Sequence, residues 1–261
     1  MVYTIADMKD NVKNWFKELK RENLLWGMGG IVVLLLVFMY FWGYNPKDVF
    51  LVGKSGILSI ELPLIQTNVF IDEVKKVTTA KENETLEFSL SPKKHSVIIS
   101  RDGYYPWTKE FIISNKKTLK LTPIFININT TGQIITNTDP EYWKLKRETV
   151  GNIPPTKNSP EISMDGIARL WMDDNAILVT IASSTYNVIQ PDTIIRNVSF
   201  YRNRSDIVIF STSNAIYVIE VNKEGKQNFM PVYKGVSPSF IKTNPAYIYV
   251  WDNETLLQVI I

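Results

Sequence analysis

The C-terminal part of the chain contains the sequence SFYRNRSDIVIFSTSNAIYVI (residues 199–219), which aligns without a gap with SFIKTNPAYIYVWDNETLLQV (residues 239–259). Both copies contain a short apolar run that is rich in β-branched and aromatic residues, Ile207–Phe210 in the first copy and Tyr247–Val250 in the second. Asn, Ser and Asp residues, which favour turns, separate these runs from the next ones. The repeat therefore predicts two successive units that each contain several short β-strands.

The 40-residue period of this repeat gives a more specific prediction. A weaker third copy begins at Leu170-Trp171 and continues with the apolar run of residues 177–180. A period near 40 is typical of the blades of a β-propeller, and we expect residues 161–261 to form two to three propeller-like β-blades. Since a propeller needs about four blades to close, we also expect uncovered strand edges, which the neighbouring module or another chain would cover.

The chain between residues 68 and 125 also has the pattern of a β-protein. Turn residues such as Ser91-Pro92 and Asp102-Gly103 separate short apolar or alternating runs. The five predicted strands are residues 69–71, 86–90, 97–99, 110–113 and 118–121. Five strands in about 55 residues predict a small β-sandwich or barrel module.

The stretch from Asn68 to Pro123 resembles the PEGA domain, a small bacterial surface β-module. The resemblance rests on Val69-Phe-Ile-Asp72, on Leu90-Ser-Pro-Lys-Lys-His95-Ser-Val97 and, most specifically, on Gly103-Tyr-Tyr-Pro-Trp107. The Pro-Glu-Gly-Ala tetrapeptide that names the family is absent, and residues 65–68 stand in its place. The resemblance implies a small β-sandwich over residues 68–125 and a location at the cell surface; it implies no activity.

Two segments that flank this module have fewer structural signals. We interpret residues 45–67 as a connector with a short β-segment. Residues 126–160 contain many Thr, Asn and Pro residues, and we expect a partly extended linker that wraps one of the flanking modules.

A transmembrane helix is predicted for residues 24–44, LLWGMGGIVVLLLVFMYFWGY, which contain no charged residue. At about 1.5 Å per residue, a helix of this length spans a hydrocarbon core of about 30 Å. Trp26 lies near one end, and Tyr40, Trp42 and Tyr44 lie near the other, as in the aromatic belts of membrane proteins.

The distribution of basic residues predicts the orientation of this helix. Lys47 and Lys54 are the only basic residues among the 20 that follow the span, whereas five precede it, namely Lys9, Lys13, Lys17, Lys20 and Arg21. The positive-inside rule places the N-terminus in the cytoplasm and the chain from residue 45 onward outside it. We therefore expect a signal anchor that holds a single-pass protein in the plasma membrane.

Residues 1–23 are predicted to form an amphipathic helix in the cytoplasm. Its apolar residues recur at a spacing of three or four, namely Ile5, Met8, Val12, Trp15 or Phe16, and Leu19. Such a helix lies on the inner headgroup surface, packs against a partner, or only fixes the topology of the chain.

The composition excludes several classes of function. A net charge of +3, from 29 basic and 26 acidic residues, argues against nucleic-acid binding. The absence of cysteine excludes disulfides and thiol chemistry, and one histidine, His95, leaves no multi-histidine metal site. The acid pairs Asp72-Glu73 and Asp173-Asp174 lie at predicted turns. We therefore expect no catalytic residue, no cofactor and no metal ion, and a protein that is not an enzyme.

Two groups of aromatic residues are the candidates for an interaction surface. Tyr104, Tyr105 and Trp107 could form a platform for sugar rings or a peptide, although packing under the sheet is the favoured role of such residues. Tyr142 and Trp143 stand beside basic residues in the linker, and we select them as the more accessible contact surface.

These features favour a non-enzymatic membrane protein of the cell envelope. Its outer β-domains would mediate protein–protein assembly, with other envelope proteins or by self-association, while the anchor contacts the lipid bilayer. The alternative is a surface tether that binds glycan or the cell wall through Tyr104–Trp107. Because the span does not suggest helix pairing, we expect the β-domains to drive assembly.

Overall fold

The computed structural model describes residues 30, 33–34, 37 and 55–261 of the chain. The predicted cytoplasmic helix, residues 1–23, lies outside the described residues, as does most of the predicted span, residues 24–44. Within the described residues, no helix has both the length and the apolar character needed to cross a membrane. The described part of the chain is mainly β, as the sequence predicts.

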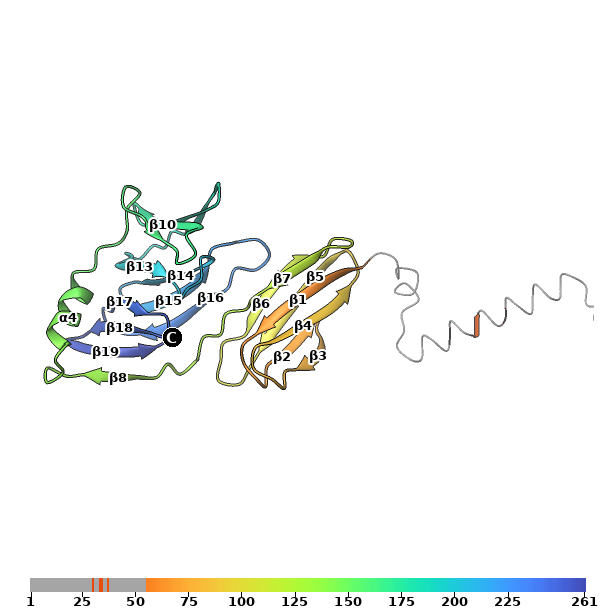
Figure 1. Cartoon of the computed structure of the whole chain (residues 1–261), viewed down its shortest axis with the longest axis horizontal. Coiled ribbons are helices and arrows are strands. Elements are labelled where there is room, and N and C mark those ends of the chain that lie inside the picture. Colours follow the sequence, from red (N-terminus) through yellow and green to blue (C-terminus); the bar gives the residue numbers. More distant parts are fainter. Residues whose placement is uncertain (1–29, 31–32, 35–36, 38–54) are drawn as a thin grey trace, which may run out of the picture.

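Residues 56–121 form an N-terminal β-unit of two sheets, at the right of the coloured part of the chain in Figure 1. The strand orders of the sheets are β4-β1-β7 and β3-β2-β5-β6. The strands are β1 (Gly56–Leu62), β2 (Asn68–Ile71), β3 (Val74–Thr78), β4 (Glu84–Leu90), β5 (Lys94–Ser100), β6 (Trp107–Ile112) and β7 (Thr118–Leu121). All five predicted strands are present, and β1 and β3 are additional.

Strand β1 shows that this unit extends into the segment interpreted as a connector. It lies between β4, its antiparallel partner, and β7, its parallel partner. Its alternate residues Leu58, Ile60 and Leu62 are fully buried. Alternation of this kind is what a strand with one face in a core requires, so β1 is a central strand of the unit.

Residues 132–260 form a second unit of three four-stranded sheets. The strand orders are β12-β11-β10-β9, β13-β14-β15-β16 and β17-β18-β19-β8. The first sheet consists of β9 (Glu161–Ile162), β10 (Ala168–Asp173), β11 (Ala176–Ile181) and β12 (Ser184–Ile189). The second consists of β13 (Asn197–Phe200), β14 (Ile207–Ser211), β15 (Ala215–Glu220) and β16 (Phe229–Lys234). The third consists of β17 (Ser239–Asn244), β18 (Tyr247–Asp252), β19 (Thr255–Ile260) and β8 (Gly132–Ile135).

The sheet β13-β14-β15-β16 is the middle layer of the three. Val208 and Phe210 of β14 pack with the sheet of β9–β12, while Ile207 and Ile209 belong to a core shared with β17–β19 and the N-terminal unit. All five residues of β14 are therefore buried, whereas β18 alternates between buried and half-buried residues. A continuous apolar run is typical of a strand that is covered on both faces.

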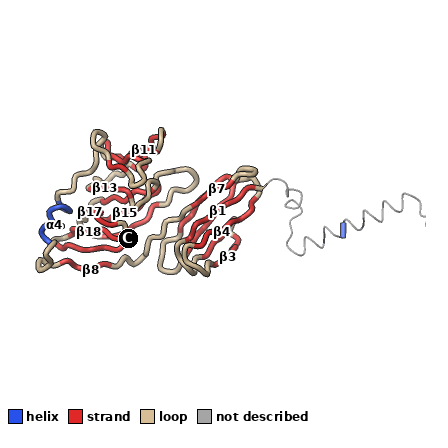
Figure 2. The backbone as a smooth tube through the Cα atoms, in the orientation of Figure 1, coloured by secondary structure: helices blue, strands red, loops and turns tan. Residues whose placement is uncertain are grey.

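The predicted linker, residues 126–160, contains two elements of this second unit. Strand β8 completes the sheet of β17–β19 by pairing with β19, and helix α4 (Tyr142–Val150) packs against β17 and β18. Figure 2 shows α4 at the far end of the second unit from the N-terminal unit. The segment thus folds with the sheets, because Leu145 and Thr149 of α4 are buried against them.

Candidate functional site

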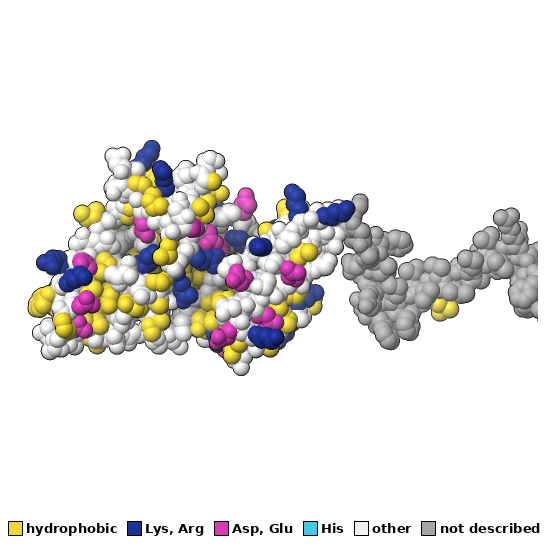
Figure 3. Space-filling view, in the orientation of Figure 1, with side chains coloured by type: hydrophobic (Ala, Val, Ile, Leu, Met, Phe, Trp, Pro, Cys, Tyr) yellow, Lys and Arg dark blue, Asp and Glu magenta, His cyan; other side chains and the backbone are white. Residues whose placement is uncertain are grey.

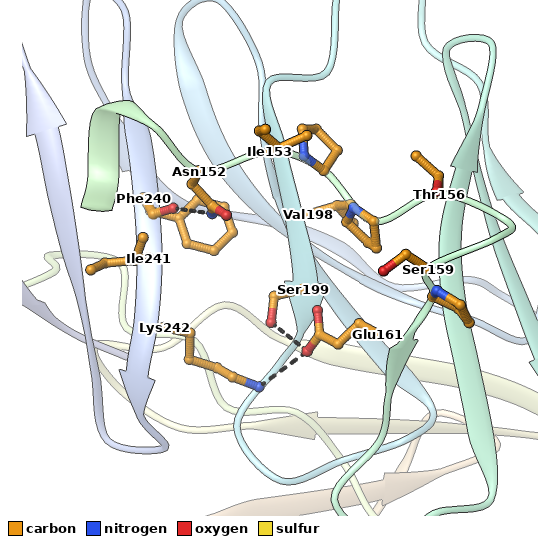
Figure 4. Close-up of a pocket in the computed structure, with 13 residues that line it drawn as sticks. Asn152, Ile153, Thr156, Ser159, Glu161, Val198, Ser199, Phe240, Ile241 and Lys242 are labelled. Atoms are coloured by element: carbon orange, nitrogen blue, oxygen red, sulfur yellow. Dashed lines mark hydrogen bonds and ion pairs between the residues drawn. The ribbon is translucent and has the colours of Figure 1, made fainter. Parts of the chain in front are cut away.

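A cleft of about 670 Å³ lies where the first strands of the three sheets meet. Strands β9, β13 and β17, each at the end of its sheet, face this cleft together with the segment 152–160 (Figure 4). The lining combines apolar and polar side chains: Asn152, Ile153, Pro154, Pro155, Thr156, Ser159, Pro160, Glu161, Val198, Ser199, Phe240, Ile241 and Lys242.

Glu161, Ser199 and Lys242 form the charged centre of the cleft (Figure 4). The Ser199 hydroxyl donates to Glu161 Oε1 at 2.8 Å, and Lys242 Nζ lies 3.8 Å from the same oxygen. Lys242 also donates to the carbonyl of Phe200 at 2.6 Å. Burial lowers the pKa of Lys242 below its ordinary value of 10.5, and the Glu161 carboxylate opposes this effect.

Side chains in the cleft bind the free backbone edges of two equivalent strands. At Phe200 of β13, Glu161 accepts the N–H at 3.2 Å and Lys242 donates to the carbonyl. At Phe240 of β17, which is the repeat equivalent of Phe200, Asn197 accepts the N–H at 3.0 Å and Asn152 donates to the carbonyl at 2.9 Å. Since unpaired strand edges must find hydrogen-bond partners, these polar residues hold the three sheets together.

The charged side chains of the cleft already form hydrogen bonds that hold neighbouring strands together. Glu161 and Lys242 are each bonded to the neighbouring strands, and Ser199 has no histidine beside it, because His95 lies in β5 of the N-terminal unit. Among the described residues, no group of three or more His, Cys, Asp or Glu side chains is placed to hold a metal ion. The arrangement therefore joins β9, β13 and β17 and leaves a recess that is lined by polar and apolar side chains.

His95 has a structural environment in the N-terminal unit. Its Nδ1 lies 2.7 Å from Asp72 Oδ2, its Nε2 lies 2.8 Å from the Ser91 carbonyl, and the ring stacks on Phe111. Burial raises the pKa of Asp72, but hydrogen bonds from Ser96 and His95 outweigh it, so that this pKa lies below its ordinary value of 3.8. The pair fixes the β2–β3 turn against β5, as Asp72 also accepts the Ser96 N–H at 3.0 Å.

Trp107, one of the candidate contact residues, is buried as the favoured packing role requires, so it does not belong to an exposed aromatic platform. It is only 2% exposed, and its Nε1 donates to Glu220 Oε1 of the second unit at 2.7 Å. Tyr104 and Tyr105 are half-buried near it, and Tyr104 lies edge-on to Phe125. Trp107 is buried and the two tyrosines are half-buried because this segment lies at the junction of the two units.

Glu220 is the centre of this junction. It is 7% exposed and forms an ion pair with Lys109 at 2.9 Å. Its Oε2 also accepts two bonds from Asn228, whose side chain in turn bonds the backbone N–H and carbonyl of Thr108. A buried carboxylate needs such a set of donors, so the network attaches the middle sheet to strand β6.

Tyr142 and Trp143 lie together on α4, away from the Tyr104–Trp107 segment. Their rings meet edge-to-face at 5.1 Å, and Trp143 is 64% exposed. Lys146 Nζ lies 5.6 Å from the Trp143 ring and 4.3 Å from the Trp251 ring, in the range of cation–π contacts. Trp143 is therefore accessible, as a contact surface requires.

The outer face of the sheet β12-β11-β10-β9 was not identified from the sequence. Arg169 and Trp171 of β10 lie on this face, because they alternate with the fully buried Ala168 and Leu170. They line a second hollow, of about 560 Å³, together with Ile167, which is 56% exposed. The buried Nε1 of Trp171 has no hydrogen-bond partner within the described part of the chain. The pattern ARLWMD carried the signal, since it alternates small or apolar residues with Arg and Trp.

Comparisons with known proteins leave the family open. No family model matches the chain, and no curated protein matches it. A solved structure from Bacteroides fragilis NCTC 9343, of a protein of unknown function that is described as membrane-associated, matches 78% of this chain and 93% of its own. The two sequences are 10% identical and the TM-score is 0.23, so this likeness carries no argument about fold or function.

Proposed function

We propose that the chain is a non-enzymatic, single-pass protein of the plasma membrane whose outer β-region assembles with other proteins. In this proposal residues 24–44 cross the bilayer, the N-terminus is cytoplasmic, the N-terminal unit is a PEGA-like module and the three sheets are propeller-like blades. The 21 uncharged residues of the span and the excess of basic residues before it support the topology. The four-stranded antiparallel sheets, with equivalent strands about 40 residues apart, support the blade assignment.

One observation carries the assembly function. The three sheets of the second unit form a stack, with the sheet of β13–β16 in the middle, and the two outer faces of this three-sheet stack differ. Helix α4 packs on the sheet of β17 and β18, whereas the outer face of β10 and β11 carries a hollow with Ile167 and Trp171. A sheet face with exposed apolar side chains such as Ile167 is stabilised by a partner that covers it. On the face drawn in Figure 3, basic and acidic side chains are interspersed, which fits a protein partner better than a polyanion.

The mass of the complex extracted gently from its native membrane tests this function. We expect a homogeneous particle much heavier than one 30.0-kDa chain with its detergent, and its other components would identify the partners. A lone chain, extracted under conditions that keep known membrane complexes intact, would contradict the assembly function.

A second candidate, a tether that binds cell-wall glycan, is favoured by the exposed ring of Trp143. Sugar-binding sites use exposed aromatic faces with nearby polar groups, and Lys146 and Tyr142 flank this ring. Trp143→Ala would then abolish sedimentation of the protein with purified cell-wall material, while Trp143→Phe would retain it. Equal sedimentation of both variants and the native chain would exclude this role of α4.

A further inference from the structure

Strand β8 forms one edge of the sheet β17-β18-β19-β8 and pairs only with β19 in the described chain. In Figure 1 it runs along the lower margin of the second unit, with no labelled element beyond it. Its residues Gly132, Gln133 and Ile134 are exposed, and Ile134 is 66% exposed. The strand therefore offers an open backbone edge to another strand.

The pairing with β19 determines which backbone groups of β8 are free. The Ile260 N–H donates to the Thr131 carbonyl at 3.0 Å, so the backbone groups of Thr131 face β19. Because these groups alternate along an antiparallel strand, those of Gln133 and Ile135 also face β19. The N–H and C=O groups of Gly132 and Ile134 consequently point to the open edge.

The other outer edges of the described sheets carry protecting features that β8 lacks. Charges, prolines and covering side chains are the usual means by which proteins prevent unwanted strand pairing. Strand β12 is covered in part by Gln227, whose side chain donates to the Val188 carbonyl at 3.3 Å. The remaining edges carry charges or proline: Lys75 and Lys76 in β3, Glu84 and Glu87 in β4, Lys109 and Glu110 in β6, Lys120 in β7, and Pro231 and Lys234 in β16. By contrast, residues 122–138 around β8 contain no charged residue.

We infer that β8 pairs antiparallel with β8 of a second copy of this chain, about a two-fold axis at Gln133. This register places Gly132 of each copy opposite Ile134 of the other, and it uses all the outward backbone groups in about four hydrogen bonds. The exposed Ile134 side chain then covers the position where Gly132 has none, and no like charges meet. The inference rests on the proposed assembly function and names a second copy as one partner.

Gly132 itself is required by the native sheet. A Cβ at this position would collide with the backbone of Gln258 in β19, so a larger residue would push β8 away from the sheet. Gly132 is thus the small residue that permits the β8–β19 contact.

The native absence of cysteine allows a direct test in the full chain. In the proposed pair the two Gln133 residues form a non-hydrogen-bonded pair with Cα atoms about 4.5 Å apart, within the range of a disulfide. Gln133→Cys should give a covalent dimer when native membranes are oxidised with copper phenanthroline, as seen on a non-reducing gel. The matched control is Asn187→Cys, an exposed position on the other uncharged edge strand, β12, which should give about tenfold less dimer.

A second variant distinguishes a loss of the β8–β8 pairing from a loss of the folded structure. In the Gln133→Cys chain, Ile134→Pro removes an outward N–H and leaves the bonds to β19 intact, so it should abolish the crosslink without unfolding the protein. Equal crosslinking of the Gln133→Cys and Asn187→Cys chains, no crosslink in either, or a disulfide to a different protein would overturn the β8 pairing. If the extracted particle is heavy but this crosslink is missing, the assembly function stands and the β8 pairing fails; a light particle without the crosslink contradicts both.

Discussion

The two ends of the three-sheet stack have the same alternation of buried and outward-facing residues, but only one of them is covered by a helix. At one end, Tyr249 and Trp251 alternate with the buried Ile248 and Val250 of β18, and α4 lies against this outer face with Lys146 over the Trp251 ring. At the other end, Arg169 and Trp171 alternate with buried residues of β10, and their face carries an open hollow.

This difference shows that the chain covers one end of the stack with its own helix, α4. The three sheets have the same four-stranded organisation. Without α4, the third sheet would therefore expose its outer aromatic face in the same way as the first sheet does. The first sheet has no corresponding helix within the described residues. In the proposed assembly, a partner would cover this open end, the outer face of β10 and β11, as α4 covers the other end.

The largest effect is expected from a change that detaches α4. Leu145→Asp places a charge where Leu145 is 6% exposed, and we expect it to lower the free energy of unfolding by about 4 kcal/mol. Denaturant unfolding of the full chain, followed by tryptophan fluorescence, measures this loss. Trp143→Ser, on the exposed side of the same helix, is the control and should change stability by less than about 0.5 kcal/mol. Equal stability of both variants would mean that α4 does not cover the sheet.

A smaller loss is expected at the middle sheet, which lies between the other two sheets and joins the N-terminal unit. Glu220→Gln keeps the bond from Trp107 and removes the charge that pairs with the buried Lys109 amine. We expect a loss of about 2 kcal/mol and easier separation of the two units, measured by limited proteolysis between residues 121 and 132. Lys94→Gln, which breaks the exposed pair with Glu110, serves as the control and should have no measurable effect.

One source of acid sensitivity should lie in the N-terminal unit, at Asp72. The folded pKa of Asp72 lies below 3.8, so its contribution to stability is fully present above the unfolded pKa and is lost as the pH falls through the folded value. Asp72→Asn should therefore flatten the decline of stability below about pH 4. Thermal unfolding of both chains between pH 6 and pH 3 measures this difference; parallel curves would show that the Asp72–His95 pair does not matter.

The smallest effect on stability, with a large effect on assembly, is expected at the open end. Ile167→Lys changes an exposed side chain and should alter stability by less than about 0.5 kcal/mol, yet it should release the chain from the heavy particle. Val150→Lys, at an equally exposed position of α4, should leave the particle intact. Size-exclusion chromatography of the extracted complexes distinguishes the two results, and loss of the particle in both would contradict a specific role for the open face.

Local sequence patterns predicted much of this fold and little of the site. The continuous run Ile207–Phe210 and the alternating run Tyr247–Val250 indicated strands, and the structure adds that the first is covered on both faces. Strand β8 was missed because four residues carry little periodicity and their partner strand lies more than 100 residues away. The Trp107–Glu220 bond joins residues 113 apart, and no local pattern encodes such a contact.

Accessibility of the open face in the native membrane tests the central claim most directly. Ile167→Cys and Val150→Cys introduce single thiols at positions that are 56% and 58% exposed, one on the open end and one on the covered end. The rate of labelling by a maleimide is measured in native membranes that have been opened and in purified single chains. We expect the Val150→Cys thiol to be labelled at the same rate in both preparations. We expect the Ile167→Cys thiol to be labelled much more slowly in the membranes than in the single chains. Equal labelling of the Ile167→Cys thiol in both preparations would contradict the claim that a partner covers this face.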